Sequence, residues 1–336
     1  MLKDVFLWEI LYDTPHLIRV KGTLNLLHID DKQNASFCKG SVGPFGMHNS
    51  SKKRTLRGQT LPDVLTEAAR CDTITVEKHN AAPRGRQESG GVRMSKKWFV
   101  VSDVHGHYSI LMEALARVGF DATDEEHVFV SCGDLFDRGG ENARVYEFVR
   151  SLPRKILIRG NHEDMLLHSL RDGCLTEAAQ SNGTDQTVLQ LLGPDTLDIH
   201  GCIVGTACRD KVAQILALGE TMVDYCELGD YILTHGWIPV IFEGRYPHIA
   251  PDWRDAPDED WEFARWLAWE ELYDIGATVR GKTIVCGHHT SRLGYRFDPS
   301  RATDCYDIFY GDGVIAIDSG TVMSGVINVL VLEDIC

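Results

Sequence analysis

Five short polar clusters, each with Asp, Asn or His close to a glycine, constrain this chain more than any other feature. Each cluster directly follows a short apolar run of the kind that forms buried strands. Open α/β sheets place ligand sites just beyond the carboxyl ends of their strands, so we expect the clusters to meet in one site. The clusters are residues 102–107, 133–139, 159–163, 234–237 and 287–290.

The segments around these clusters predict an α/β fold. Strand-like runs alternate with stretches of helical spacing from residue 98 to residue 170, which favours βαβ units and a largely parallel sheet. Later strand-like runs indicate a second sheet packed on the first, so we expect a two-sheet sandwich flanked by helices. The expected strands are 98–101, 128–130, 156–158, 221–227, 231–234, 283–286, 314–317 and 326–332, and the expected helices are 108–118, 142–149, 163–170, 186–192 and 211–218.

Residues 1–93 differ from the rest of the chain in charge. They hold 14 basic and 10 acidic side chains, whereas residues 94–336 hold 20 basic and 39 acidic ones. Residues 81–93 have the composition of a linker. We therefore expect an unrelated N-terminal extension or small module at 1–93, with short elements at 5–12, 61–69 and 73–76, and a separate domain at 94–336 that carries all five polar clusters. Because so acidic a domain repels a nucleic-acid backbone, no nucleic-acid partner is expected.

The ten cysteines and the absence of long apolar runs favour a cytoplasmic protein. No two cysteines have C-x-x-C spacing, and their spread along the chain indicates reduced thiols rather than a disulfide framework. No apolar run approaches the roughly 18 residues of a membrane span. Charged residues interrupt the N-terminal stretch, unlike a secretory signal, so no membrane partner is expected.

The polar clusters contain the side chains that a pair of divalent cations needs. Such a pair requires a bridging carboxylate with imidazole, carboxylate or amide ligands on either side. Asp103 and His105 follow one strand and can reach one ion, and Asp134 can bridge. Asn161 and His235, with a histidine of the fifth cluster, can hold the second ion. Oxygen and nitrogen ligands without thiolate favour Mn, Fe, Zn or Ni over Ca.

In order, the clusters read D-x-H-G, G-D-x-x-D-R-G, G-N-H-E, H-G and G-H. This set resembles the calcineurin-like metallophosphoesterases over residues 98–325. The D-R-G and G-N-H-E motifs resemble those of the phosphoprotein phosphatase branch, which includes small bacterial and phage serine/threonine phosphatases and symmetrical diadenosine tetraphosphatases. The resemblance implies two divalent ions, with manganese preferred, and a hydroxide between them that attacks phosphorus in line.

The resemblance also implies a role for each matching residue. Asp103 and His105 would bind the first metal, Asp134 would bridge, and Asn161 and His235 would bind the second. The last ligand is His288 or His289, and we favour His288 because it directly follows the glycine.

Two further residues would contact the substrate, and a third would support one of them. His162 would protonate the leaving oxygen, Asp137 would orient or charge-stabilise His162, and Arg138 would hold the phosphoryl oxygens. A second phosphate-binding arginine is expected in the C-terminal half, where Arg254, Arg265 and Arg292 are candidates and Arg265 is preferred.

We therefore expect a hydrolase of phosphomonoesters, acting on phosphoserine or phosphothreonine or on small phosphoesters. A dinucleoside polyphosphate hydrolase is the alternative, because it would use the same metal ligands. A phosphate-binding scaffold without activity and a nuclease are weaker alternatives. Four tryptophans between residues 253 and 269 favour core packing, and an aromatic wall beside the site is the second interpretation of them.

Overall fold

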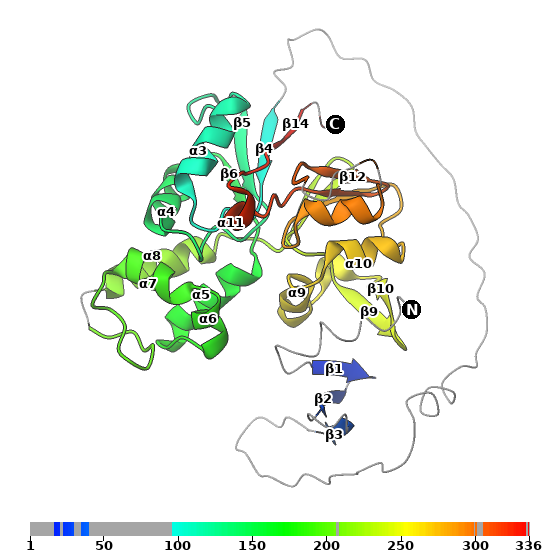
Figure 1. Cartoon of the computed structure of the whole chain (residues 1–336), viewed down its shortest axis with the longest axis horizontal. Helices are drawn as coiled ribbons and strands as arrows, with labels where there is room; N and C mark the ends of the chain where they lie inside the picture. The colour runs from blue at the N-terminus through cyan, green and yellow to red at the C-terminus, as the bar shows by residue number, and fades with distance from the viewer. Residues whose placement is uncertain are drawn as a thin grey trace, which may run out of the picture. The chain divides into compact units, whose positions relative to one another are not determined.

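The structure is a computed structural model that describes residues 96–205, 208–298, 300, 305–333 and 335, together with three earlier strands. The chain divides into two compact units, Met1–Arg84 and Gly85–Cys336. In the first unit, β1 (Leu17–Val20), β2 (Thr23–Ile29) and β3 (Ala35–Lys39) form an antiparallel sheet (Figure 1). The elements expected at 5–12, 61–69 and 73–76, and the linker at 81–93, lie outside the described residues.

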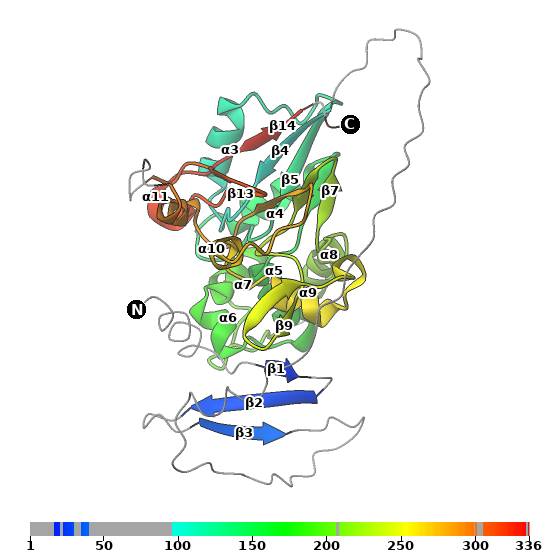
Figure 2. The same ribbon diagram turned by 90° about the vertical axis from the view of Figure 1, so that its right-hand side faces the viewer.

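The second unit contains two larger sheets (Figures 1 and 2). In the first, β4, β5 and β6 are parallel and β14 is antiparallel at one edge. In the second, β8, β11 and β13 are parallel, with β7 and β12 antiparallel at the two edges. The first sheet has the order β14 (Leu330–Leu332), β4 (Lys97–Val101), β5 (His127–Ser131), β6 (Lys155–Leu157), and the second has the order β12 (Phe309–Gly311), β13 (Val314–Ala316), β11 (Thr283–Cys286), β8 (Tyr231–Leu233), β7 (Cys226–Leu228).

The two sheets pack face to face through the side chains on one face of each strand. Val100 of β4 lies in one buried cluster with Val285 of β11, so these faces of the two sheets meet. Its neighbour Phe99 points the other way, into a cluster with helix residues, because successive strand side chains alternate between faces. Ile284 of β11 likewise points outward, to a third cluster. The predicted two-sheet sandwich flanked by helices is confirmed.

Helices cover both outer faces of this sandwich (Figure 1). The first sheet packs against the group that includes α3, α4 and α5, and the second against α9 and α10. A short hairpin and one-turn helices complete the unit. The helices are α3 (Tyr108–Arg117), α4 (Asn142–Ser151), α5 (Asn161–Asp172), α6 (Glu177–Ser181), α7 (Thr184–Leu192), α8 (Arg209–Gly219), α9 (Asp258–Ala264), α10 (Trp269–Asp274) and α11 (Thr321–Ser324), and the hairpin is β9 (Val240–Glu243) with β10 (Tyr246–Ile249).

Three of the four tryptophans between residues 253 and 269 do not share one helix: Trp261 lies in α9, Trp269 begins α10, and Trp266 lies between the two helices. Helix α9 ends at Ala264, whose carbonyl accepts the backbone N–H of Trp237 at 3.0 Å. A Cβ atom on Gly236 would lie 2.7 Å from that carbonyl, so only glycine lets the loop approach so closely. Trp261 and Trp269 are buried in the core, as is Trp253, whereas Trp266 is 49% exposed.

Two predicted strands are shorter than expected. Of the stretch 221–227, only Cys226 and Glu227 enter a strand, β7, and before it Val223 makes an isolated bridge to Ile158. The last strand begins at Leu330 rather than at residue 326. Among the described residues, no helix has both the length and the apolar character needed to cross a bilayer.

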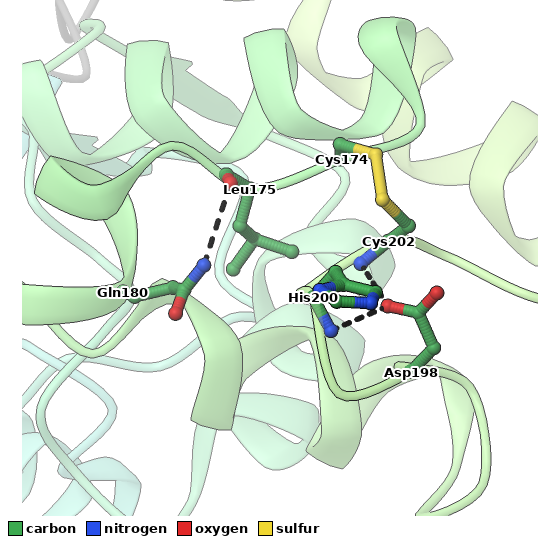
Figure 3. The surroundings of a disulfide bond; sticks show 6 residues. All are labelled: Cys174, Leu175, Gln180, Asp198, His200 and Cys202. Carbon is green, nitrogen blue, oxygen red and sulfur yellow. Dashed lines mark hydrogen bonds between the residues drawn. A yellow bond between two sulfur atoms is a disulfide. The ribbon is translucent and has the colours of Figure 1, made fainter.

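The expectation that all the cysteines are reduced is wrong, because Cys174 and Cys202 form a disulfide (Figure 3). Cys174 lies just after α5, and the return of the chain from α7 brings Cys202 opposite it in an antiparallel bridge. The backbone N–H of Leu175 donates to Gly201, and Asp198 accepts from the N–H groups of His200 and Cys202. This pairing follows from the path of the chain, which spacing alone does not show.

Candidate metal centre

The five polar clusters follow the carboxyl ends of β4, β5, β6, β8 and β11, and backbone hydrogen bonds join them. The N–H of Asp103 donates to Gly133, and that of His105 donates to Asp134, at 3.1 and 3.0 Å. Within the second sheet, the N–H of Gly287 donates to the His235 carbonyl at 2.8 Å, and across the sandwich the N–H of His288 donates to Oδ2 of Asp103 at 3.0 Å. Loops from both sheets therefore form one continuous polar site.

The backbone at this site is unusual. Among the described residues, six that are not glycine have a positive φ, and all six belong to the set predicted from the sequence. A left-handed backbone costs free energy for residues with a Cβ, and such residues concentrate at functional sites. They are Asp103, His105, Asp134, Asp137, Arg138 and His288.

Asp134 is shared by two groups of side chains that could each hold a cation. In both groups the potential ligand atoms lie within 4.8 Å of one another. Asp134 is 2% exposed, so each ion would be largely removed from solvent. The first group is His105, Asp134 and His162, and the second is Asp134, His235 and His288.

Asp103 and Asn161 adjoin these groups. One Asp103 oxygen, Oδ1, lies 3.8 Å from Nε2 of His105, and the other accepts hydrogen bonds from the Ser102 hydroxyl and the His288 N–H. Oδ1 of Asn161 lies 2.9 Å from Nε2 of His235. The structure thus brings together all six residues predicted as metal ligands.

Two of the histidines are oriented as metal ligands usually are. Nδ1 of His105 lies 3.0 Å from the Phe136 carbonyl, and Nδ1 of His235 lies 2.8 Å from the Cys132 carbonyl. A ring whose Nδ1–H donates to a carbonyl presents Nε2 as the free ligand atom. Nε2 of His105 is 3.7 Å from Asp134 Oδ2, too far for a hydrogen bond but within the ~4.2 Å that two ligands of one ion can span.

Electrostatics at the site favour bound positive charge. Burial opposes ionisation of Asp134, but His235 and His162 outweigh it and hold the pKa of Asp134 well below its usual value. Burial likewise opposes a charged His235, yet Asp134 and Asp103 raise the pKa of His235 to about 10. Burial lowers the pKa of His105 to about 3 and keeps it neutral. The negative charge of these carboxylates is strong enough to keep a buried imidazole protonated, so it would also stabilise a bound divalent cation.

A second set of contacts joins Arg138, His162 and Asp137. The Arg138 guanidinium reaches Nε2 of His162 at 3.0 Å and Nε2 of His105 at 2.8 Å. On its other side, Nδ1 of His162 lies 2.8 Å from Oδ2 of Asp137, which is fully buried. Burial opposes protonation of His162, but Asp134 and Asp137 outweigh it and raise its pKa. His162 is therefore suited to hold a proton.

The remaining predicted residues have other hydrogen-bond partners, although His289 also lines the cavity beside the candidate ligands. His289 points to Glu270, with Nδ1 3.0 Å from a carboxylate oxygen. Arg265 is 2% exposed, and its two terminal nitrogens bind Asp164 and Asp224. A cavity of about 310 Å³ beside the ligands is lined by Arg138 and not by Arg265.

The other two candidate arginines also have partners within the described part of the chain. Arg254 pairs with Glu227 and lies over the Trp253 ring, and Arg292 lies over the Tyr306 ring. Among the described residues that line the cavity, Arg138 is the one arginine.

Sequence reasoning missed two buried acids at this site. Glu163 accepts hydrogen bonds from the N–H groups of Gly160, Asp134 and Leu135, and so holds the loop that carries Asp134. Burial raises the pKa of Glu163 to about 7. Asp318 lines the cavity two residues after β13, and burial raises its pKa well above the usual value. Its place after a strand and near Gly320 is the signal that marked the other clusters.

Comparison with known proteins decides the family. The family described as "Calcineurin-like phosphoesterase" matches residues 96–317, which contain every ligand named above. The chain belongs to this family. The predicted resemblance is thereby confirmed, and relatives of this calcineurin-like phosphoesterase carry the names expected for the phosphoprotein phosphatase branch.

Three curated relatives share short stretches with the phosphoesterase. The symmetrical bis(5'-nucleosyl)-tetraphosphatase of Coxiella burnetii is 33% identical over 113 residues, which cover 34% of this chain and 37% of that protein. Serine/threonine-protein phosphatase 1 of Salmonella typhimurium is 38% identical over 76 residues, covering 22% and 34%. The asymmetrical tetraphosphatase PrpE of Bacillus velezensis is 27% identical over 159 residues, covering 44% and 59%. The chain thus spans about a third of the length of the first two.

Replacing Gly287 by Ala should disrupt the phosphoesterase site. The new Cβ would overlap the Ser102 hydroxyl and the carboxylate of Asp103, a predicted ligand, so this carboxylate must move. We expect a loss of about 1–3 kcal/mol in the free energy of unfolding and weaker metal binding. Denaturant unfolding and elemental analysis would measure both. Gly140→Ala is the control, because its Cβ meets nothing within 4 Å. Equal behaviour of the two variants would contradict the prediction.

Proposed function

We propose that this chain is a metal-dependent phosphoesterase that hydrolyses phosphomonoesters, either phosphoserine and phosphothreonine or small phosphoesters. One observation carries the proposal: Asp134 is shared by two ligand groups, and Arg138 and the His162–Asp137 pair lie directly beside them. A general acid, an anion-binding arginine and a place for two cations are the parts that phosphoester hydrolysis needs.

Asp103, His105, Asp134, Asn161, His235 and His288 would hold two divalent ions, with manganese preferred and iron, zinc or nickel as alternatives. When bound, such ions supply a nucleophile by lowering the pKa of water and offset the charge of the phosphoryl group. Because Asp134 is common to both groups, it would be a ligand of both ions.

Arg138 and His162 would handle the phosphoryl group and the leaving oxygen. The planar guanidinium of Arg138 can donate two parallel hydrogen bonds to phosphoryl oxygens. Nε2 of His162 would donate its proton to the departing oxygen, while Asp137 at Nδ1 keeps the ring oriented and stabilises its positive charge. The raised pKa of His162 supports this role, since the ring must carry a proton before each turnover.

A dinucleoside polyphosphate hydrolase is the second candidate. It is favoured by the exposed Trp266, whose ring lies edge-on to His288 with centroids 5.9 Å apart and so could stack against a base. The relative named as a symmetrical tetraphosphatase is consistent with it. The apolar side of the cavity, lined by Leu293 and by the exposed Val322 and Met323, is consistent with either leaving group.

A substrate panel tests the proposal. The purified full chain would be assayed with Mn²⁺ on p-nitrophenyl phosphate, a phosphoserine peptide, a phosphothreonine peptide and diadenosine tetraphosphate. We expect phosphate release from the monoesters that depends on added metal. Preference for diadenosine tetraphosphate by more than about a hundredfold in kcat/KM would favour the second candidate. Absence of metal-dependent turnover on every substrate would refute both.

A further inference from the structure

One face of helix α7 lies against the loop that carries Asp137. Thr184, Thr187 and Gln190 are three residues apart, so they project from the same side of the helix. Gln190 binds the backbone N–H of Asn142 and the carbonyl of Gly139, which fixes α7 against this loop. Thr184 and Thr187 are fully buried, and their hydroxyls reach Asp137 itself.

The two threonines hold both oxygens of the Asp137 carboxylate. Thr184 donates its hydroxyl to Oδ2 at 2.7 Å, the oxygen that also contacts Nδ1 of His162. Thr187 donates to Oδ1 at 2.6 Å. The Thr187 hydroxyl also accepts the backbone N–H of Asp137 at 3.0 Å, so it fixes both ends of this residue.

Asp137 needs such support for two reasons. It is fully buried, and an ionised carboxylate without hydrogen-bond donors is costly in such surroundings. Its backbone is also left-handed, with φ 72°, so local geometry does not favour the conformation that points at His162. Gly183, which precedes α7, adds a close contact, because a Cβ there would lie 3.0 Å from the backbone nitrogen of Arg138.

We propose that Thr184 and Thr187 are positioning residues for the leaving-group acid: they fix the Asp137 carboxylate so that it orients the His162 ring. The inference rests on the proposed function, in which His162 protonates the leaving oxygen. Loss of either hydroxyl would leave the metal ligands in place but allow the Asp137 carboxylate to turn away from Nδ1. The reaction would then be slowed at the step in which His162 protonates the leaving oxygen.

The test compares substrates that differ only in how much protonation their leaving group needs. Thr187→Val removes the hydroxyl with little change of shape. Phenyl phosphate has a poor leaving group, and we expect its kcat to fall about tenfold or more, within the range that general acid catalysis contributes. The kcat for p-nitrophenyl phosphate, whose leaving group needs little protonation, should fall less than about threefold, with KM unchanged for both. Thr184→Val should act in the same direction.

Two further variants separate positioning from general damage. Thr187→Ser keeps the hydroxyl and should restore kcat for phenyl phosphate to within about twofold of the wild type. Thr176→Val removes the N-cap of α6, the helix that precedes α7, without touching Asp137. It should therefore leave the ratio of the two kcat values unchanged. Bound metal and thermal unfolding would be measured for each variant.

Either of two results would overturn the inference: equal losses on both substrates in Thr187→Val, or a failure of Thr187→Ser to restore the phenyl phosphate rate. If His162→Asn leaves turnover of both substrates intact, the proposed function itself fails. If His162→Asn is impaired but Thr184→Val and Thr187→Val behave like the wild type, only the positioning role fails.

Discussion

Replacing Asp134 by Asn should lower kcat for p-nitrophenyl phosphate by about 10³-fold or more and reduce the bound metal. Asp134 is the side chain common to both ligand groups, and His235 and His162 keep it ionised. The amide of Asn carries no negative charge, but its oxygen can still accept the backbone N–H of His162, which lies 3.1 Å from Oδ1 of Asp134. The fold should therefore persist. Loss of the cations would forfeit several kcal/mol of transition-state stabilisation, at about 1.4 kcal/mol per factor of ten.

Asp121→Asn is the matched control for this variant. Asp121 is exposed and binds Thr123 at the protein surface, so the same change of charge should leave activity and metal content unaltered. Elemental analysis and steady-state kinetics on both variants would decide. An Asp134→Asn protein that keeps its full metal content and more than about a tenth of the wild-type kcat would refute the bridging role.

Replacing His162 by Asn should lower kcat by about 10²- to 10⁴-fold, the range that a positioned acid contributes. The loss should be greater for phenyl phosphate than for p-nitrophenyl phosphate, because only the former depends strongly on protonation of the leaving oxygen. Bound metal should remain, since in this role His162 holds a proton rather than an ion. Kinetics and metal content, measured together, test both statements.

The His162→Asn variant also separates two roles that the geometry offers. His162 lies in one potential ligand group with His105 and Asp134, as well as beside Asp137. A fall in metal content with equal losses on both substrates would assign it as a ligand instead. The control is His168→Asn, because His168 is half exposed and pairs with Glu262 on the surface. It should match the wild type in both measurements.

Much of this fold could be predicted because its signals are local. The apolar runs that became β4, β5, β8 and β11 are short and end at polar clusters, and each side chain's face follows from alternation along the strand. That the candidate ligands would meet could be predicted for the same reason, since the carboxyl ends of parallel strands gather at one edge of a sheet.

The parts that could not be predicted depend on contacts between distant segments. Thr184 and Thr187 reach Asp137 across 47 and 50 residues, and nothing in their own neighbourhood marks them. At the end of helix α9, the Ala264 carbonyl accepts the backbone N–H of Trp237, which follows β8 and is distant in the sequence. Spacing did not identify the second phosphate-binding arginine, and the preferred candidate, Arg265, pairs in the fold with the carboxylates of Asp164 and Asp224.

The left-handed residues of the candidate metal centre lower the stability of the fold, but their side chains belong to the site. Each strained residue costs roughly 1–3 kcal/mol, and glycine would relieve much of that cost. At Asp103, Asp134 and His288, however, glycine would also delete a side chain from the site. Engineering for heat resistance should therefore find its largest backbone gains at positions where turnover is lost, and useful stabilising substitutions must come from elsewhere in the sandwich.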